Sequence, residues 1–403
     1  MKDFFDLITI GGGASGIIAS IAAAERNRKV LMLEKSDHPG RKILASGNGR
    51  CNLINTGYPR YYGDHHFAEQ VIARYSADRL SEYFQKIGLL TTEEEDGRKY
   101  PLTYQSSSVM SVLKNALKLN HVTVENNSCV TEVCRNSEGF TVSTEGGKKY
   151  RGKKVLIACG GAAQPKLGGT KDGYSLLKSL GHTVVPVSPA LVPLNTDKKS
   201  ISGLSGIRTK CCVSLFRNHE MLHREYGEVL FTEYGVSGIC IMQCARFSGS
   251  PDTYIELDFL HDILGDKTAI LSELKRRRSM LSDFSPVSLL DGVLNAKVSY
   301  AVMKQAGIPL HGETAGELSD DDLDRITQAV THYRLNINGT RGFDYAQVTA
   351  GGADCSEFNP ETMESKIVPG IYAAGEVLNV DGDCGGFNLM FAFSSGITAG
   401  TAI

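Results

Sequence analysis

A glycine-rich segment near the N-terminus has the spacing of a dinucleotide-binding turn. Residues 11–16 read Gly-Gly-Gly-Ala-Ser-Gly and satisfy G-x-G-x-x-G, directly after the apolar run 7–10 and before residues 17–25 of helical composition. In such a turn the first glycine permits the bend, the second lets the backbone approach a pyrophosphate, and the third lets helix and strand pack closely. The helix N-terminus adds free N–H groups and partial positive charge. The candidate pyrophosphate-binding residues are therefore Gly11, Gly13, Ala14, Ser15 and Gly16.

An acidic residue completes this pattern. A second apolar run, 30–33, ends at Glu34 and is followed by Lys35. A carboxylate about 20 positions after the glycines is where a dinucleotide fold binds a ribose diol. A glycine-rich turn that matches the pattern by chance is the alternative, but strand, helix and acid all stand in the required order. Glu34 and Lys35 are candidate cofactor-binding residues.

Two more predicted strands end in glycine. Residues 155–157 lead into Ala158-Cys159-Gly160, and residues 371–373 lead into Ala374-Gly375-Glu376. Ligands of open parallel sheets bind at the carboxyl ends of the strands. One ligand that reaches three such ends would be an extended dinucleotide, and the C-terminal segment favours FAD over NAD because a ribityl chain and ring must also be held. The alternative is that these glycines only form turns. The candidates here are Ala158, Cys159, Gly160, Gly375 and Glu376, with Val130 from a short strand-like segment at 128–134.

The stretch 40–55 is rich in glycine, asparagine and cations. We expect it to form neither a helix nor a central strand, but a loop that wraps around the ligand. Arg41 and Lys42 would lie near anionic oxygens, and residues 46–52 near the polar edge of a heterocycle. A plain surface loop is the alternative, although structureless loops of this length are usually functional. The candidates in the second part are Ser46, Gly47, Asn48, Cys51 and Asn52.

A helix is predicted at the C-terminus, over residues 389–402, after Gly386, Phe387 and Asn388. Its N-terminal end would direct N–H groups and a positive dipole toward the ligand. Reduced flavin carries negative charge at N1 and O2, so such a helix would favour the reduced state. An ordinary glycine-initiated helix without a ligand is the alternative.

The distribution of these patterns predicts an α/β fold with an insertion. Residues 1–189 and 346–403 carry the α/β signature and form the predicted FAD-binding domain. Residues 190–260 and 334–345 alternate apolar and polar side chains with frequent glycine, as in a sheet or partial barrel. Residues 261–333 are predicted to be helical, with helices over 269–278, 289–305 and 320–333.

Composition narrows the class of protein further. The 403 residues carry a net charge of −2, which argues against a polyphosphate or an anionic membrane as the main partner. The basic run 275–278 is therefore interpreted as a solvated helix face, with nucleic-acid contact as the alternative. The first ten residues lack the pattern of a signal peptide, and the longest apolar run is too short to span a bilayer. We expect a cytoplasmic protein that acts on a small molecule, with no nucleic acid, membrane or obligate protein partner.

The 10 cysteines are scattered, with no C-x-x-C motif and no zinc-binding spacing. We therefore expect no metal site and no disulfide framework. Cys51 and Cys384 both fall in ligand motifs, so a redox dithiol across the flavin is an alternative that spacing alone does not support.

Four motifs together resemble the YhiN/BaiN-like family of FAD-dependent oxidoreductases, and the resemblance covers the whole chain in order. They are the segments 40–55, 231–238 (FTEYGVSG), 347–352 (QVTAGG) and 374–388. The resemblance implies a glutathione-reductase-like Rossmann FAD domain with an inserted β-barrel-like domain and a small helical domain. Members have been linked to aminoacetone oxidation and to reduction of unsaturated 3-oxo bile acids. Glu233 and Ile239 stand where this family usually has His and Pro, and the chain has no Trp, so no member's substrate is carried over.

The favoured hypothesis is a flavin-dependent oxidoreductase that transfers hydride between FAD and a small organic substrate. NADH, NADPH or oxygen would be its redox partner, and NADH or NADPH the candidate electron donor. The cofactor carries the chemistry in such enzymes, so the sequence identifies no catalytic acid or base. An RNA-modifying or RNA-binding flavoprotein and a non-catalytic FAD-binding protein are the alternatives.

Overall fold

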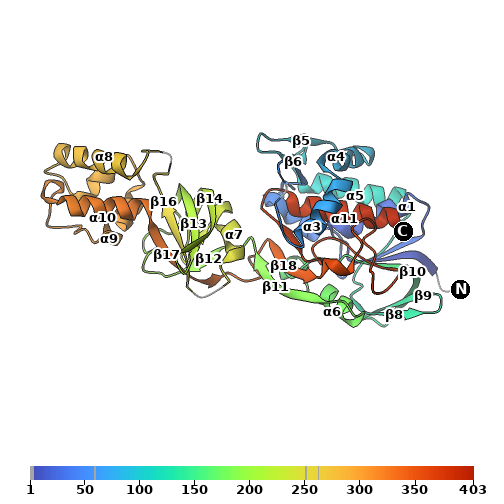
Figure 1. The fold of residues 1–403 in the computed structure, drawn as a ribbon. Helices are drawn as coiled ribbons and strands as arrows, with labels where there is room; N and C mark the ends of the chain where they lie inside the picture. Colours follow the sequence, from blue (N-terminus) through green and yellow to red (C-terminus); the bar gives the residue numbers. More distant parts are fainter. Residues whose placement is uncertain (1–3, 59, 250–251, 262) are drawn as a thin grey trace. The chain divides into compact units, whose positions relative to one another are not determined.

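A computed structural model describes residues 4–58, 60–249, 252–261 and 263–403. The chain divides into two compact units (Figure 1). We call Met1–Pro189 with Gln347–Ile403 the sheet unit, and Ala190–Ala346 the barrel unit. The predicted α/β class with an inserted barrel and a helical part is confirmed.

A mainly parallel sheet forms the centre of the sheet unit. Its parallel strands lie in the order β7 (Thr123–Glu125), β2 (Val30–Leu33), β1 (Phe4–Ile10), β10 (Lys149–Ile157) and β19 (Ile371–Ala373). The hairpin β8 (Val130–Asn136) and β9 (Gly139–Thr144) continues the sheet antiparallel from the first half of β10. β1 and β2 are apolar runs buried almost throughout, as expected for strands covered on both faces.

Two helices from opposite ends of the chain pack along one another. α1 (Ala14–Ala24) follows the glycine turn, and α11 (Phe387–Ala402) ends the chain. A Cβ added at Gly396 would lie 2.5 Å from the carbonyl oxygen of Ser15, and one at Gly400 would lie 2.3 Å from that of Ala19. Only glycine therefore permits this helix spacing.

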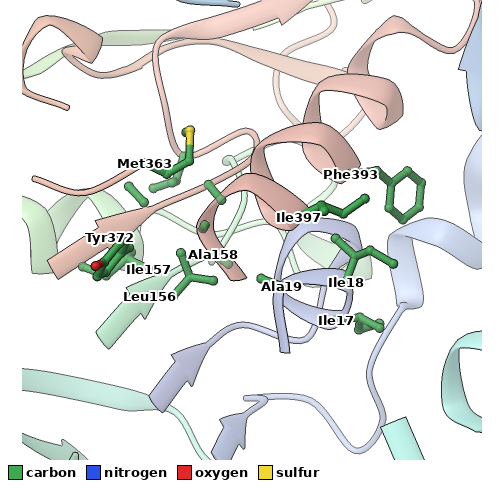
Figure 2. Close-up of a cluster of buried hydrophobic side chains, with 14 of the residues drawn as sticks. Ile17, Ile18, Ala19, Leu156, Ile157, Ala158, Met363, Tyr372, Phe393 and Ile397 are labelled. Carbon is green, nitrogen blue, oxygen red and sulfur yellow. The ribbon is translucent and has the colours of Figure 1, made fainter. Parts of the chain in front are cut away.

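The core joins these helices to the strands. In Figure 2, Ile18 of α1 lies toward Ile397 and Phe393 of α11, and all three side chains are fully buried. The C-terminal helix is thus part of the same core as the N-terminal βαβ unit.

Shorter elements surround this centre. They are α2 (Arg41–Ala45), η1 (Ser46–Gly49), β3 (Ile54–Asn55), β4 (Tyr61–Gly63), α3 (His65–Arg74), α4 (Ala77–Lys86), β5 (Thr91–Glu93), β6 (Arg98–Pro101), α5 (Ser106–Leu119), η2 (Pro165–Leu167), α6 (Asp172–Ser179), β11 (Val184–Ala190), β18 (Val348–Ala353), η6 (Cys355–Glu357) and β20 (Val380–Gly382). β3, β6 and β5 form a small sheet, β4 pairs with β20, and β11 pairs with β18.

A closed barrel dominates the barrel unit. Its strands are β12 (Leu194–Thr196), β15 (Gly235–Ser237), β14 (Glu220–Phe231), β13 (Arg208–Arg217), β16 (Thr253–Asp258) and β17 (Tyr333–Thr340), in spatial order. α7 (Ile239–Cys244) and η3 (Ala245–Phe247) follow β15. β17 closes the barrel by pairing with both β12 and β16, after the helical part has been inserted between β16 and β17.

The helical part contains α8 (Lys267–Met280), η4 (Pro286–Leu290), α9 (Ala296–Gln305), η5 (Ala315–Glu317) and α10 (Asp320–Thr331). The continuous helix predicted over 289–305 is wrong. The chain turns at Gly292, whose φ is +72°, and Asn295 then caps α9 by accepting the N–H of Lys297. None of the helices in the described part of the chain combines the length and apolar composition needed to span a bilayer.

Candidate cofactor site

The parallel strands end in one row. In the strand pairing, Ile10 lies beside both Leu33 and Ile157, and Ile157 lies beside Ala373. The residues that follow these ends are Gly11, Glu34, Ala158 and Ala374. The predicted glycine and acidic segments, which are distant in the sequence, are therefore neighbours at the carboxyl edge of the sheet.

The glycine turn is tightly packed on one side and open on the other. Gly11 has φ +106°, and a Cβ there would lie 2.4 Å from the carbonyl oxygen of Ala158. A Cβ at Gly16 would lie 1.9 Å from the carbonyl oxygen of Gly11, which is the close helix–strand packing that the third glycine permits. At Gly13 a Cβ would meet nothing within 4 Å, and this residue caps α1 without a side-chain acceptor. Ser15, beside it, donates its hydroxyl to the carbonyl of Ala374, 3.2 Å away.

Glu34 is held rigidly at the end of β2. Its Oε2 accepts the N–H of Gly12 at 2.7 Å, and its Oε1 accepts the N–H of Ser36 at 2.8 Å. The carboxylate therefore points back toward the glycine turn, and each oxygen retains capacity for a further donor.

Several other predicted residues lie near Glu34. The Ser128 N–H donates to the Glu34 carbonyl, which brings the segment that leads into Val130 to the end of β2. Lys35 pairs with Asp172 at the start of α6, with Nζ and Oδ2 3.9 Å apart. Val130 is buried, whereas Lys35 is partly exposed.

The segment after β10 closes the same region. The Ala158 N–H donates to the Ile10 carbonyl at 2.8 Å, and the Cys159 thiol lies 3.6 Å from the same carbonyl oxygen. Burial raises the pKa of Cys159 to about 12, and the carboxylates of Asp172 and Glu34 act in the same direction. Cys159 is therefore a neutral thiol at physiological pH. Gly160 has φ +71°, and the only atom within 4 Å of a Cβ there would be a Glu376 oxygen.

The stretch 40–55 departs from the predicted structureless loop. It contains the short helix α2, the 3₁₀ segment η1 and the two-residue strand β3. Ile43 is buried, and Ser106 at the start of α5 donates its hydroxyl to the carbonyl of Leu44. Most residues of α2 are good helix formers, and this tertiary packing stabilises a turn of helix that is too short to be stable alone. The Gly40 N–H donates to the Gly12 carbonyl at 2.8 Å, which fastens this stretch to the glycine turn.

Lys42 and Glu376 join this stretch to the last parallel strand. Lys42 Nζ lies 2.7 Å from Glu376 Oε2, and Glu376 Oε1 accepts the N–H of Thr349 at 2.8 Å. Thr349 Oγ1 in turn accepts the N–H of Ala163. Arg41 points elsewhere, because its guanidinium donates to the carbonyl of Lys166.

The second half of the stretch is a compact turn. Gly47, Asn48 and Cys51 all have φ between +55° and +58°, and the Cys51 N–H donates to the Ser46 carbonyl. Gly47 and Asn48 are exposed, whereas Cys51 is fully buried. Asn52 is buried too, and its Oδ1 has no hydrogen-bond partner among the described residues.

The N-terminus of α11 lies against this turn. Gly386 has φ +107°, and a Cβ there would lie 2.7 Å from both Asn52 Oδ1 and the carbonyl oxygen of Ile54. We expected this glycine to allow close approach of a ligand, but its Cβ direction is filled by the chain itself. Asn388 uses its side-chain amide locally, since it accepts the Gly382 N–H and donates to the Gly382 carbonyl. Phe387 is buried, and its carbonyl accepts the Tyr61 hydroxyl.

Arg98, from β6, is the residue at this helix end that the sequence motifs did not indicate. Its Nε would lie 3.4 Å from a Cβ at Gly385, two residues before α11 begins, and it pairs with Asp96 at 3.1 Å. Its side chain is 28% exposed. No local pattern singles out Arg98, because only the pairing of β6 with β3 brings it to this place.

The thiols of the ligand motifs are not activated. Burial raises the pKa of Cys51 to about 11, and burial also raises the pKa of Cys384. All 10 cysteines are free, and the described residues contain no group of three or more metal-binding side chains suited to a metal ion. The geometry therefore gives no support to the dithiol alternative.

Comparison with known proteins agrees with this architecture. The family model described as the HI0933-like protein Rossmann domain matches residues 5–402. The chain is 34% identical over 408 residues to the 3-dehydro-bile acid delta(4,6)-reductase of Clostridium scindens, covering 98% of this chain and 97% of that protein. It is 30% identical over 397 residues to the ribosomal RNA dihydrouridine synthase of Escherichia coli, covering 97% and 96%.

Solved structures share the fold at low sequence identity. A 3-ketosteroid delta1-dehydrogenase from Sterolibacterium denitrificans is 13% identical, with a TM-score of 0.51 and coverage of 99% of both chains. A flavocytochrome c3 fumarate reductase is 15% identical, with a TM-score of 0.50 and coverage of 99% of this chain and 78% of that one. The resemblance inferred from the motifs is confirmed by the full-length matches: this chain belongs to the HI0933-like family of FAD-dependent oxidoreductases, of the YhiN/BaiN type.

Proposed function

We propose that this chain is an FAD-dependent reductase that saturates a carbon–carbon double bond conjugated to a carbonyl group in a small organic molecule, with NADH or NADPH as electron donor. Two relatives that align over nearly their whole length are named for reductions of this kind, one on a 3-dehydro bile acid and one forming dihydrouridine. A Δ4 bond beside a 3-oxo group and the C5–C6 bond of uracil are both conjugated to a carbonyl. The reaction class is therefore shared although the two substrates differ.

The observation that carries the proposal is the row of strand ends at the carboxyl edge of the sheet unit. Two features of this edge fit an extended dinucleotide. Gly13 lies at the N-terminus of α1 with open space where a side chain would be, which suits a pyrophosphate. The Glu34 carboxylate stands at the end of the adjacent strand, which suits a ribose diol.

The predicted residues divide into two groups along such a ligand. The adenosine and pyrophosphate part would be held by residues of the glycine turn and of the neighbouring strand ends: Gly11, Gly13, Ala14, Ser15, Gly16, Glu34, Lys35, Val130, Ala158, Cys159 and Gly160. The ribityl and flavin part would be held by residues of the stretch 40–55 and of the C-terminal segment: Arg41, Lys42, Ser46, Gly47, Asn48, Cys51, Asn52, Gly375, Glu376, Gly386, Phe387 and Asn388. When bound, FAD supplies hydride transfer, while the protein supplies orientation and electrostatics.

Charge at the N-terminus of α11 supports a reductive role. The first turn of the 16-residue helix presents backbone N–H groups, and Arg98 brings a guanidinium close to Gly385, two residues before the helix begins. Both would favour negative charge on a ring edge placed there.

The basic run on α8 is partly compensated, which weakens the case for an RNA partner. Arg276 and Arg277 pair with Glu273 at 2.8 Å, and Lys275 and Arg278 pair with Asp320 at 2.8 and 2.9 Å. Four cations share these two carboxylates, and because the whole chain carries a net charge of −2, we favour a small molecule over RNA.

The test is anaerobic reduction and reoxidation of the purified holoprotein. NADH or NADPH should bleach the flavin absorbance, and an enone such as 2-cyclohexen-1-one or a 3-oxo-Δ4 steroid should restore it and yield the saturated ketone. The saturated ketones themselves are the control and should restore nothing. If oxygen alone restores the absorbance, the protein is an oxidase, and if dihydrouridine forms only in ribosomal RNA, the RNA alternative is correct.

A further inference from the structure

One arginine of the barrel unit contacts two tyrosine rings. Arg341 directly follows β17, and its N–H donates to the Pro193 carbonyl at 3.1 Å. Its guanidinium carbon lies 4.4 Å from the ring centroid of Tyr234 and 4.3 Å from that of Tyr345. Tyr234 belongs to the tight turn between β14 and β15, where the Thr232 N–H donates to the Gly235 carbonyl. The backbone of Arg341 is therefore fixed by Pro193, and its guanidinium is held by two tyrosines from separate parts of the barrel sequence.

This guanidinium has no counterion within the part of the chain that the structure describes. Arg341 is partly buried, and its Nε is a buried atom without a hydrogen-bond partner among the described residues. No ion pair or side-chain hydrogen bond involves Arg341 in that part of the chain, and Glu233, beside Tyr234, is exposed and does not pair with it.

Four arginines on the barrel strands each have a partner for the guanidinium, although the Nε of Arg217 is also buried without one among the described residues. Arg208 pairs with Glu228, Arg217 donates to the Phe247 carbonyl, Arg224 donates to Ser214, and Arg334 donates to Asn336. Arg334 is the nearest match, because its guanidinium also stacks on a tyrosine, Tyr254, at 3.6 Å. Arg334 thus combines stacking on a tyrosine with a side-chain hydrogen bond, whereas Arg341 has the stacking without a hydrogen bond from its side chain to a described residue.

A second polar atom without a partner belongs to the same strand pair, on Asn195, which pairs with Gly339 two residues before Arg341. Asn195 of β12 donates its Nδ2 to the carbonyl of Thr340, the residue before Arg341, at 3.0 Å. Its Oδ1 is buried and has no partner among the described residues. The bond to a carbonyl fixes which amide atom is the nitrogen, so the orphaned atom is an acceptor.

Physical chemistry makes an anion the expected partner of Arg341. Removing a cation from water without a counterion is unfavourable, and two aromatic rings offset that cost only in part. A guanidinium presents its remaining donors as a planar fork, whose geometry matches the two oxygens of a carboxylate. Tyrosine contacts restrict the side chain in advance, so less conformational entropy is lost when such a ligand binds.

We propose that Arg341, held by Tyr234 and Tyr345, binds a carboxylate, and that the substrate of the reductase bears this group. The first part stands on the barrel unit alone, whereas the second rests on the proposed function. The two parts therefore need separate measurements.

The first experiment measures the site without turnover. The full-length holoprotein is treated with phenylglyoxal, and labelling of Arg341 and Arg334 is quantified by peptide mass spectrometry. Acetate, succinate and benzoate are the probes, and their amides are the neutral controls. We expect at least one carboxylate to slow labelling of Arg341 severalfold while its amide and the Arg334 site show no change. If no carboxylate slows the labelling of Arg341, or if Arg341 is not labelled at all, the proposed carboxylate site is wrong.

The second experiment uses two enones that differ only in carrying a carboxylate or its methyl ester. In the wild type we expect a higher kcat/KM for the acid than for the ester. In Arg341→Gln we expect kcat/KM for the acid to fall roughly ten- to hundredfold, mainly because KM rises, while kcat/KM for the ester stays unchanged. Arg334→Gln is the matched control and should leave the ratio unchanged. Equal losses for acid and ester would make Arg341 a structural residue only. If the wild type reduces neither enone, the proposed function fails, while the labelling result still decides the binding site.

Discussion

Lys42 Nζ lies 2.7 Å from Glu376 Oε2, so the first turn of α2 is tied to the segment that follows the last parallel strand. The two side chains are 30% and 20% exposed. Because Glu376 also accepts the Thr349 N–H, its carboxylate links three segments of the sheet unit. The carboxyl edge is therefore a connected frame that exists before any ligand binds.

This pair should contribute measurable coupling to stability. A double-mutant cycle of Lys42→Met and Glu376→Gln in the apoprotein is expected to give a coupling of about 0.5–2 kcal/mol, since both charges are largely shielded from water. The exposed pair Lys148 and Glu125 is the control and should give less than about 0.5 kcal/mol. Equal coupling in the two pairs would show that Lys42 and Glu376 do not form a stabilising contact in solution.

Two glycines of the same turn should have separable roles. Gly16→Ala is expected to lower the free energy of unfolding of the apoprotein by about 1–3 kcal/mol, because a Cβ would collide with the Gly11 carbonyl. Gly13→Ala should change stability by less than about 1 kcal/mol, since φ is −85° and the space is open. It should instead weaken FAD binding by roughly tenfold or more, which is about 1.4 kcal/mol.

Urea denaturation and fluorescence titration with FAD measure these two effects separately. Unchanged FAD affinity in a folded Gly13→Ala variant would show that the pyrophosphate does not bind at this turn.

Arg98 should raise the reduction potential of the bound flavin. Removing its charge in Arg98→Gln is expected to lower the midpoint potential by about 10–40 mV, given about 0.5–2 kcal/mol for a partly buried charge and about 30 mV per 1.4 kcal/mol. Asp96→Asn removes the partner of Arg98 and should shift the potential in the opposite direction. A substitution at Gly386 is a poorer test, because its φ of +107° and its contact with Ile54 would be disrupted.

A spectroscopic redox titration with confirmed FAD occupancy measures both variants. Shifts of the same sign in Arg98→Gln and Asp96→Asn would contradict an electrostatic role for this pair.

A buried Ser–His–Glu arrangement in the sheet unit is structural. His182 Nδ1 lies 2.8 Å from Glu357 Oε2, and its Nε2 lies 3.0 Å from Ser365 Oγ. This oxygen accepts the N–H groups of Ile367 and Val368, and Ser365 is only 5% exposed, so its hydroxyl is not placed to attack a substrate.

This network should make stability depend on pH. Burial alone would raise the pKa of Glu357, but hydrogen bonds from Thr183 and His182 outweigh it and lower the pKa. The stabilisation is therefore fully present above the ordinary value of 4.5 and is lost as the pH falls through the lower folded value. Glu357→Gln should destabilise the protein at pH 7 and show a smaller difference from wild type at pH 4, measured by urea denaturation. The exposed Glu361→Gln is the control, and a difference independent of pH would contradict this linkage.

The strand ends were predictable because buried strands leave a local mark. The apolar runs that end at Ile10 and Leu33 are followed directly by a glycine and an acid, and the run that ends at Ile157 reaches a glycine after two more residues. Helix α2 was missed because the flanking glycines and asparagines were given more weight than the helix-forming residues 41–45, and no local pattern shows their packing on α5.

Residues whose role depends on distant partners were missed for the same reason. Arg98 reaches α11 through strand pairing, and Arg341 meets Tyr234 across the barrel, so no local spacing marks either one. The positive φ of Gly386 could be expected because the residue is glycine. Its close contact with Ile54, which leaves no room for a Cβ, could not be expected from the sequence.

The most direct test of the account is the identity and amount of flavin in the purified protein. Denaturation should release FAD, identified by chromatography, at about one molecule per chain. The apoprotein should bind added FAD but not added riboflavin. Glu34→Ala should bind it about 1.5–3 kcal/mol more weakly, the range for hydrogen bonds to a charged group, while the exposed Asp37→Ala should not. A protein that releases no flavin and fails to bind added FAD would contradict the central claim that the carboxyl edge of this sheet is a dinucleotide site.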